Sequence, residues 1–221
     1  ANLAIGSVEV RRLNRQDEPP AGLRRYRHGR DAWSAVTPEE RMDIWLSLDL
    51  MQGPRCAYCD GPMGDGNRHI EHFRQRGRYR QGTFDWSNLF GSCNRAGTCG
   101  KAKDQCGAYP PETLIKPDIE DPDVFLLFTP GGTVRPRAGL TANNHLRATE
   151  TIRILVLDGA LNQIRRAQLC GYIKTMEIFA DYAEAYPDDD SWVEELEREV
   201  RDTAHLPYAT AIRHVLTRQS E

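Results

Sequence analysis

Four of the six cysteines form two close pairs, and their spacing points directly to chemistry. Cys56 and Cys59 form a C-x-x-C pair, 33 residues separate Cys59 from Cys93, and five separate Cys93 from Cys99. Two close thiolate pairs joined by a loop suit a tetrahedral structural zinc site, with Zn–S distances of about 2.3 Å. Glycines beside both pairs allow the tight turns that such sites use. The spacing predicts that these four cysteines bind one zinc ion.

Alternatives remain open for the cysteines. Cys56 and Cys59 could be a redox pair beside two ordinary buried cysteines, although no thioredoxin-like βαβ pattern surrounds them. Cys106 could replace Cys99 as the fourth ligand. The remaining Cys170 lies in a helical pattern, which predicts a position in the core.

The stretch HIEHF, residues 69–73, lies between the cysteine pairs and places a carboxylate between two imidazoles. Phosphodiester hydrolysis needs a base to activate water and a cation to stabilise charge on the phosphate. His72 suits the base, because an imidazole titrates at about pH 6.5, and Glu71 suits a hard cation such as Mg²⁺ or Mn²⁺. On a strand, His69 shares a face with Glu71, whereas His72 points to the other face. We therefore expect a bend that brings Glu71 and His72 together, with His69 either a further metal ligand or a structural residue.

A basic segment follows. Four alternating arginines offer guanidinium groups to phosphate oxygens: Arg74, Arg76, Arg78 and Arg80. Residues 55–103 carry nine Lys or Arg against four Asp or Glu, whereas residues 104–221 carry 12 against 20. A basic island in an acidic chain predicts that nucleic acid binds there, with Lys101 and Lys103 contributing. The alternative is a run of solvated charges.

The first half of the chain contains the elements that must position these groups. Residues 1–36 predict an arm, with a short strand-like SVEV followed by a segment broken by proline and glycine. A helix is predicted over residues 37–52, where Thr37 and Glu40 form a capping box. Residues 55–103 are rich in glycine and poor in apolar periodicity, so a metal ion must supply much of their stability.

The second half changes from strands to helices. A strand is predicted at residues 124–128, and TVRPR at 133–137 returns as its partner after a Pro-Gly-Gly turn. From residue 141 the apolar spacing predicts helices, which either pack only within this chain or present one face to a partner. No run of 18 apolar residues and no signal-peptide core occur, so we expect a cytoplasmic protein that does not enter a membrane.

The order of these motifs resembles that of HNH (ββα-metal) endonucleases: C-x-x-C, then H-x-E-H, then W-x-N-L, then the second cysteine pair and its lysines. A closer likeness covers residues 37–137, where CAYCD, HIEHFR, FDWSNLFGSC, CGKAKD and ETLIKPDIEDPDVFLLF are similar to the PtuB family. Members of that family are HNH nuclease subunits that partner an SMC-like ATPase in Septu antiphage systems and in some retrons.

The resemblance implies an α+β fold in three parts. Residues 1–36 would form an N-terminal arm, and residues 37–137 a zinc-stapled ββα-metal nuclease module. Residues 138–221 would form a mostly α-helical region that docks a partner.

The resemblance also implies roles for single residues. His72 corresponds to the general base, Glu71 to the acidic ligand of a catalytic Mg²⁺ or Mn²⁺, and Asn88 to the central asparagine whose amide ties the loop between the strands. The family's metal ligand on the helix falls near Lys101, and a protonated lysine cannot bind a cation. Lys101 could instead replace the charge of the metal, or a second ligand could come from one of three residues: Asn94, Asp104 or His69.

The function expected from this likeness is that of an antiphage effector. It would cleave nucleic acid, DNA in preference with RNA or tRNA kept open, while held by an SMC/ABC-like (PtuA-like) ATPase. In a retron, a reverse transcriptase and its multicopy single-stranded DNA would join the complex. The alternative is a non-catalytic zinc-ribbon subunit that binds nucleic acid or supports assembly.

Overall fold

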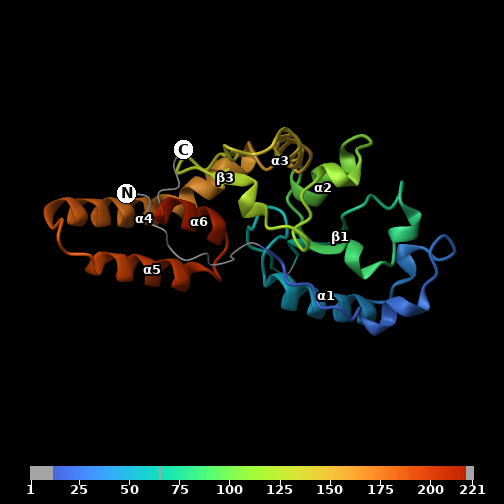
Figure 1. The fold of residues 1–221 in the computed structure, drawn as a ribbon. Coiled ribbons are helices and arrows are strands. Elements are labelled where there is room, and N and C mark those ends of the chain that lie inside the picture. Colours follow the sequence, from blue (N-terminus) through green and yellow to red (C-terminus); the bar gives the residue numbers. More distant parts are fainter. Residues whose placement is uncertain (1–11, 65, 218–221) are drawn as a thin grey trace.

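The computed structural model describes residues 12–64 and 66–217, so the strand-like SVEV lies outside the described residues. Six α-helices and two small antiparallel hairpins form an α+β fold over these ranges (Figure 1). Along the same ranges, no helix is both long enough and apolar enough to cross a membrane.

Helix α1, Pro38–Gln52, forms where the sequence predicts it. The Thr37 side chain accepts a hydrogen bond from the Glu40 amide, and the Glu40 side chain accepts one from the Thr37 amide. This capping box satisfies two of the amides that every helix start leaves free. Ile44 and Leu48 on the inner face are fully buried, so α1 is one wall of the core.

The first hairpin pairs β1, Arg68–His72, with β2, Leu89–Cys93. The pairing is antiparallel and regular along all five residues, from Arg68 opposite Cys93 to His72 opposite Leu89. The Gln52 amide at the end of α1 clamps β2, because it both accepts from the Gly91 amide and donates to the Gly91 carbonyl at 2.9 Å. Helix α2, Cys99–Gln105, follows, which completes a ββα order.

Several 3-10 turns connect these elements. They span Ala21–Arg25, Trp33–Ala35, Arg80–Gly82, Trp86–Asn88, Pro111–Thr113 and Pro122–Val124. In the described part of the predicted arm, Arg15 contacts the Trp86–Asn88 turn, β2 and Asp118. Its guanidinium donates to the carbonyl oxygens of Trp86 and Leu89 and pairs with Asp118.

The second hairpin is shorter than predicted. Strand β3 covers Leu126–Phe128 and pairs with β4, Val134–Pro136. The predicted strand began at residue 124, but Pro122 and the Asp121 side chain start a 3-10 turn there, in which Asp121 accepts a hydrogen bond from the Asp123 amide. The strand therefore begins only after this turn.

The helices of the C-terminal part are α3, Ala142–Ile154; α4, Ala160–Ala185; α5, Ser191–Thr203; and α6, Ala209–Leu216. Helices α4 and α5 lie side by side and project away from β1 and α2 (Figure 1). Cys170 is exposed on α4, so the prediction that it would be a core residue is wrong. The apolar face of that helix is instead carried by residues such as Leu161 and Leu169.

The helical part is tied to the segment that carries the first cysteine pair. The Tyr208 amide at the start of α6 donates to the Asp60 carbonyl at 2.7 Å, and the Thr210 amide donates to the Asp60 carboxylate. Arg55 donates to the Ala204 carbonyl after α5. Residues from both parts of the chain therefore share one hydrophobic core.

The turn between β3 and β4 supplies a test of this packing. Gly132 has a φ of +83°, and a Cβ there would overlap the Asn162 carbonyl oxygen of α4, whereas a Cβ at Gly131 would meet only Thr129 Oγ1 at 3.6 Å. We expect Gly132→Ala to lower the free energy of unfolding by about 2 kcal/mol or more. Gly131→Ala is the control and should change it by less than about 1 kcal/mol. Equal values from urea denaturation of the two variants would contradict this packing.

Candidate functional site

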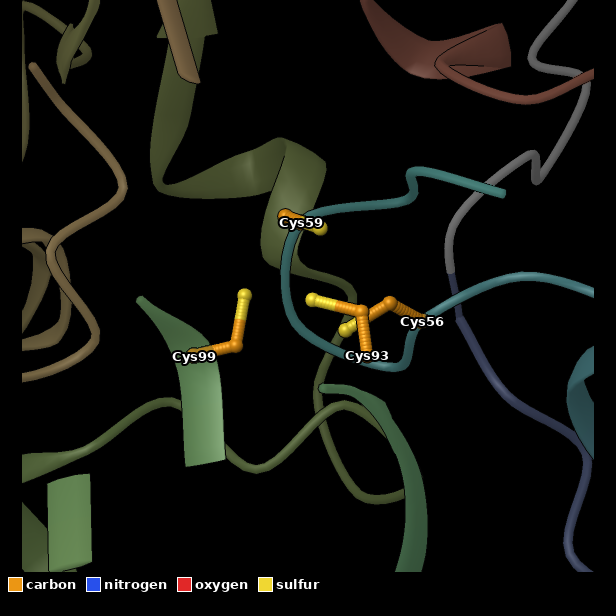
Figure 2. A group of neighbouring side chains, drawn as sticks. All are labelled: Cys56, Cys59, Cys93 and Cys99. Atoms are coloured by element: carbon orange, nitrogen blue, oxygen red, sulfur yellow. The ribbon is translucent and has the colours of Figure 1, made fainter. Parts of the chain in front are cut away.

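Four buried cysteines gather at the junction of three elements. Cys56 and Cys59 lie in the loop after α1, Cys93 ends β2, and Cys99 begins α2. Their sulfur atoms all lie within 4.8 Å of one another and face a common centre (Figure 2). None of them forms a disulfide. This arrangement confirms the predicted four-cysteine group.

The donor set fits a structural zinc ion. Four thiolates are the donors of closed tetrahedral zinc sites, and burial keeps water from the fourth position. Burial raises the pKa of Cys56, but hydrogen bonds with the other three thiols outweigh it and bring that pKa well below the ordinary value. Cys106 is not part of the group, because it is partly exposed and its thiol donates to the Lys103 carbonyl at 3.1 Å. Cys99 is therefore the fourth member.

Glu71 lies in a buried ion pair with Lys103. Its Oε1 is 2.6 Å from Lys103 Nζ, and its Oε2 is 3.2 Å from His69 Nε2. The carboxylate is 1% exposed, and the Lys103 side chain is not exposed at all. Gly100 allows this packing, because a Cβ there would lie 2.5 Å from Glu71 Oε2. His69 thus shares a strand face with Glu71, as predicted from the alternation along β1.

The prediction that Lys103 contacts nucleic acid is corrected by its burial. Burial disfavours its ammonium, but the Glu71 carboxylate and neighbouring groups favour it more, so the pKa of Lys103 is raised above its ordinary value. Lys103 Nζ also lies 2.8 Å from Asp104 Oδ1. Lys101, two residues earlier on α2, is exposed and remains able to meet a polyanion.

His72 packs against different neighbours. Its Nε2 lies 3.0 Å from the Thr83 carbonyl oxygen, and its ring meets the Trp33 ring edge-on at 4.6 Å between centroids. Burial lowers the pKa of His72 to about 3. The regular register of β1 contains no bulge, so the expected bend that would bring Glu71 and His72 together is not formed. Neighbouring side chains on a regular strand point to opposite faces.

Asn88 closes the loop between the two strands. Its Oδ1 accepts a hydrogen bond from the Arg74 amide at 2.7 Å, and its Nδ2 donates to the Gly82 carbonyl at 2.9 Å and to the Arg74 carbonyl at 3.3 Å. The Phe73 amide donates to the Asn88 carbonyl at 2.8 Å. Both ends of the loop at residues 73–88 are thereby fixed beside His72.

The basic loop places its cations on the surface. Arg74, Arg76, Arg78 and Arg80 are all exposed. Gln75 between them is buried and donates to the Lys103 carbonyl at 2.7 Å, which anchors the loop on α2. The charge of Arg76 contributes to the lowered pKa of His72, although less than burial does. Arg76 is therefore the arginine of this loop whose charge reaches the buried imidazole.

A catalytic divalent cation does not fit Glu71 as the chain is folded. Within residues 12–64 and 66–217, the four cysteines are the only group of three or more His, Cys, Asp or Glu side chains that gathers closely enough to hold a metal. The carboxylate of Glu71 already contacts an ammonium group, and Asn94 donates its side-chain amide to the Arg68 carbonyl at 3.1 Å. The four cysteines thus suit a zinc ion, whereas Glu71 does not suit the expected Mg²⁺ or Mn²⁺.

Some partners in the site carry no clear signal in the sequence. Trp33, Gln75 and Thr83 position His72 and the basic loop, yet each is an ordinary residue in a polar or aromatic stretch. Lys103 lies four residues after Cys99, which is a helical spacing that places both on one face, but seven residues are too few to predict the inner face of a helix from sequence.

Removal of one zinc ligand tests the metal centre. We expect Cys93→Ser to lose the bound zinc and much of the stability of the module, because structural zinc supplies folding free energy on the order of 10 kcal/mol. Elemental analysis and thermal unfolding measure the two effects. Cys106→Ser and Cys170→Ser are matched controls that should keep one zinc per chain. A full zinc content in Cys93→Ser would reject the assignment.

The buried imidazole predicts a pH dependence. The pKa of His72 is about 3 in the folded chain and about 6.5 when unfolded, so the unfolded chain takes up this proton first. The contribution to stability is complete above about pH 6.5 and declines as the pH falls toward 3. Between pH 7 and pH 5, the chain should lose about 2 kcal/mol more unfolding free energy than its His72→Gln variant. The same loss in both chains, measured by denaturant titration, would argue against a buried neutral imidazole.

Comparisons with known proteins add no family to this description. No protein-family model matches the chain, and a search of curated proteins finds no match. The functional assignment therefore depends on the geometry of the site and on the motif resemblance.

Proposed function

We propose that this protein is a nuclease of the HNH type that hydrolyses nucleic-acid phosphodiesters with His72 as the general base. The observation that carries the proposal is the hydrogen bond of His72 Nε2 to the Thr83 carbonyl, beside a loop that Asn88 closes and that presents four exposed arginines. A site built only to bind phosphate would need the arginines and not the oriented imidazole.

The hydrogen bond sets the tautomer of the base. A carbonyl oxygen can only accept, so His72 Nε2 carries the proton and the lone pair is on Nδ1. The pKa of about 3 keeps the ring neutral at physiological pH, so the Nδ1 lone pair carries no proton. A base with so low a pKa accepts a proton weakly, so bound substrate would have to raise the pKa of His72 toward neutrality for efficient catalysis. Asn88 assists by fixing the backbone of Arg74 and Gly82 on both sides of the loop. It acts as a positioning residue.

The exposed arginines supply the contact with substrate. Guanidinium groups pair with phosphate oxygens in two-pronged geometry, and Arg76 is near enough to affect the charge state of His72. Such contacts position a backbone without reading sequence, and they serve DNA and RNA alike. DNA is the substrate that the family resemblance favours, with RNA or tRNA as the second candidate. Lys101 extends the basic surface along α2.

A bound Mg²⁺ or Mn²⁺, which the resemblance implies, would stabilise charge on the phosphate. Glu71 does not fit this role while Lys103 contacts it, so we assign no step to a cation on that carboxylate. Asp104 is about half exposed and His69 faces Glu71, so neither is placed as a further ligand.

The C-terminal helices favour a protein partner over nucleic acid. Residues 104–221 carry an excess of eight acidic residues, 20 against 12, and an acidic surface repels a phosphate backbone. The hairpin of α4 and α5 projects from the rest of the chain (Figure 1). We propose that it docks an SMC/ABC-like ATPase that restrains the nuclease until phage infection. A retron reverse transcriptase with its single-stranded DNA is a further partner of the same cytoplasmic complex.

The second candidate is a non-catalytic subunit that binds nucleic acid or supports assembly. The ion pair of Glu71 with Lys103 and the burial of His72 favour this second candidate, because neither Glu71 nor His72 is freely open to solvent. The two candidates differ in one property: a binding subunit keeps its function when the imidazole is removed.

Replacement of the base separates the candidates. We expect His72→Ala to lower plasmid or oligonucleotide cleavage by about 10²- to 10⁴-fold, the usual contribution of a general base, while zinc content and nucleic-acid affinity are kept. The assay is run with the purified chain and its ATPase partner, in Mg²⁺, in Mn²⁺ and in neither. His145→Ala, on the exposed face of α3, is the control and should cleave normally. Undiminished cleavage by His72→Ala would reject the base, and no cleavage by any chain would favour the binding subunit.

A further inference from the structure

We propose that the ammonium group of Lys103 is a built-in cation that takes the position a divalent metal would have between Glu71 and Asp104. Two carboxylate oxygens from different residues approach this nitrogen, Glu71 Oε1 at 2.6 Å and Asp104 Oδ1 at 2.8 Å. Hard divalent cations are held by carboxylate oxygens in a similar way, at about 2.0–2.6 Å. One point between β1 and α2 is therefore already occupied by positive charge.

Burial keeps the Lys103 ammonium beside Glu71 in the folded chain. Lys103 is fully buried and Glu71 is 1% exposed, so water does not separate the two charges. A buried carboxylate without a partner is costly, and the ion pair removes that cost. Burial opposes the charge on Lys103, yet the Glu71 carboxylate keeps the pKa of the lysine raised, so the cation persists at physiological pH.

The surroundings leave no room for both cations. Gly100 lies so close that even a Cβ would reach within 2.5 Å of Glu71 Oε2. On the strand side, His69 Nε2 contacts the same oxygen at 3.2 Å. Each oxygen of Glu71 thus has a partner in Lys103 or His69. A divalent ion could bind this carboxylate only if the Lys103 ammonium moved away, which would break the buried ion pair and displace a fully buried side chain of α2.

Removal of the lysine side chain would leave three potential metal donors around its position. Without the lysine side chain, Glu71 and Asp104 would retain oxygens facing one point, with the His69 imidazole beside them. His69 Nδ1 is buried and has no hydrogen-bond partner among the described residues. Two carboxylates and one imidazole form a donor set that suits Mn²⁺. These donor atoms do not gather as closely as the four sulfurs do, so they would have to move together once the lysine side chain is gone. Replacement of Lys103 by a small side chain should therefore allow these residues to bind Mn²⁺ and should not merely destabilise the fold.

One consequence concerns catalysis and rests on the proposed function. If the chain cleaves phosphodiesters, the positive charge near the phosphate comes from protein groups such as Arg76 and not from a divalent ion on Glu71. Cleavage by the zinc-loaded chain should then change by less than about 2-fold when Mg²⁺ and Mn²⁺ are omitted. A metal that acts through Glu71 would instead be required.

Binding of Mn²⁺ to the zinc-loaded full chain tests the proposal without any assay of activity. Electron paramagnetic resonance counts bound Mn²⁺, and amide broadening in ¹⁵N-labelled protein locates it. We expect the natural chain to show no site with a Kd below about 1 mM and no selective broadening at residues 69–72 or 100–104. Lys103→Ala should gain one site, and its Tm should rise by several degrees in Mn²⁺. Lys101→Ala, on the exposed side of α2, should behave like the natural chain.

Two results of these Mn²⁺ measurements would overturn the proposal. Selective Mn²⁺ broadening around Glu71 in the natural chain would overturn the proposal, and this measurement does not depend on the folding of any variant. A folded Lys103→Ala that binds no Mn²⁺ would also overturn it. A failed nuclease assay would reject the proposed nuclease function but would not change the Mn²⁺ binding result. The role of Lys103 and the nuclease function can therefore be rejected separately.

Discussion

The convergence of four sulfur atoms is the constraint on which the rest of this structure depends. The sulfurs come from three short segments: the loop after α1, the end of β2 and the start of α2. Strands β1 and β2 have five residues each, and α2 has seven. A structural zinc ion held by these sulfurs would supply folding free energy on the order of 10 kcal/mol. The module can then carry a basic, glycine-rich loop.

The functional groups follow from that junction. Because Cys99 fixes the start of α2, Lys103 one turn later faces β1 and meets Glu71. Because Cys93 fixes the end of β2, the register along the hairpin places His72 at the opposite end of β1, beside Thr83. A buried ion pair contributes little net stability, but loss of one partner is costly. In this protein, the Glu71–Lys103 ion pair fixes how α2 lies against the β1–β2 hairpin.

Local signals predicted the parts of this fold that depend on neighbouring residues. The cysteine spacing indicated the zinc group, the Thr37–Glu40 capping box fixed the start of α1, and the Pro-Gly-Gly turn placed the second hairpin. The partner of Glu71 could not be predicted, since Lys103 is 32 positions away and only the docked helix shows that it points inward while Lys101 points outward. The prediction that Cys170 is a core residue was wrong for a related reason. A long helix has several faces, and the apolar pattern did not show which face packs against the core.

The ligands of the bound metal decide whether the four sulfurs hold a structural zinc ion. X-ray absorption at the zinc edge of the purified chain reports the type, number and distance of the ligands. We expect one zinc per chain with four sulfur neighbours at about 2.3 Å and no nitrogen or oxygen neighbour. A shell with nitrogen or oxygen ligands, or a folded chain free of zinc, would contradict it.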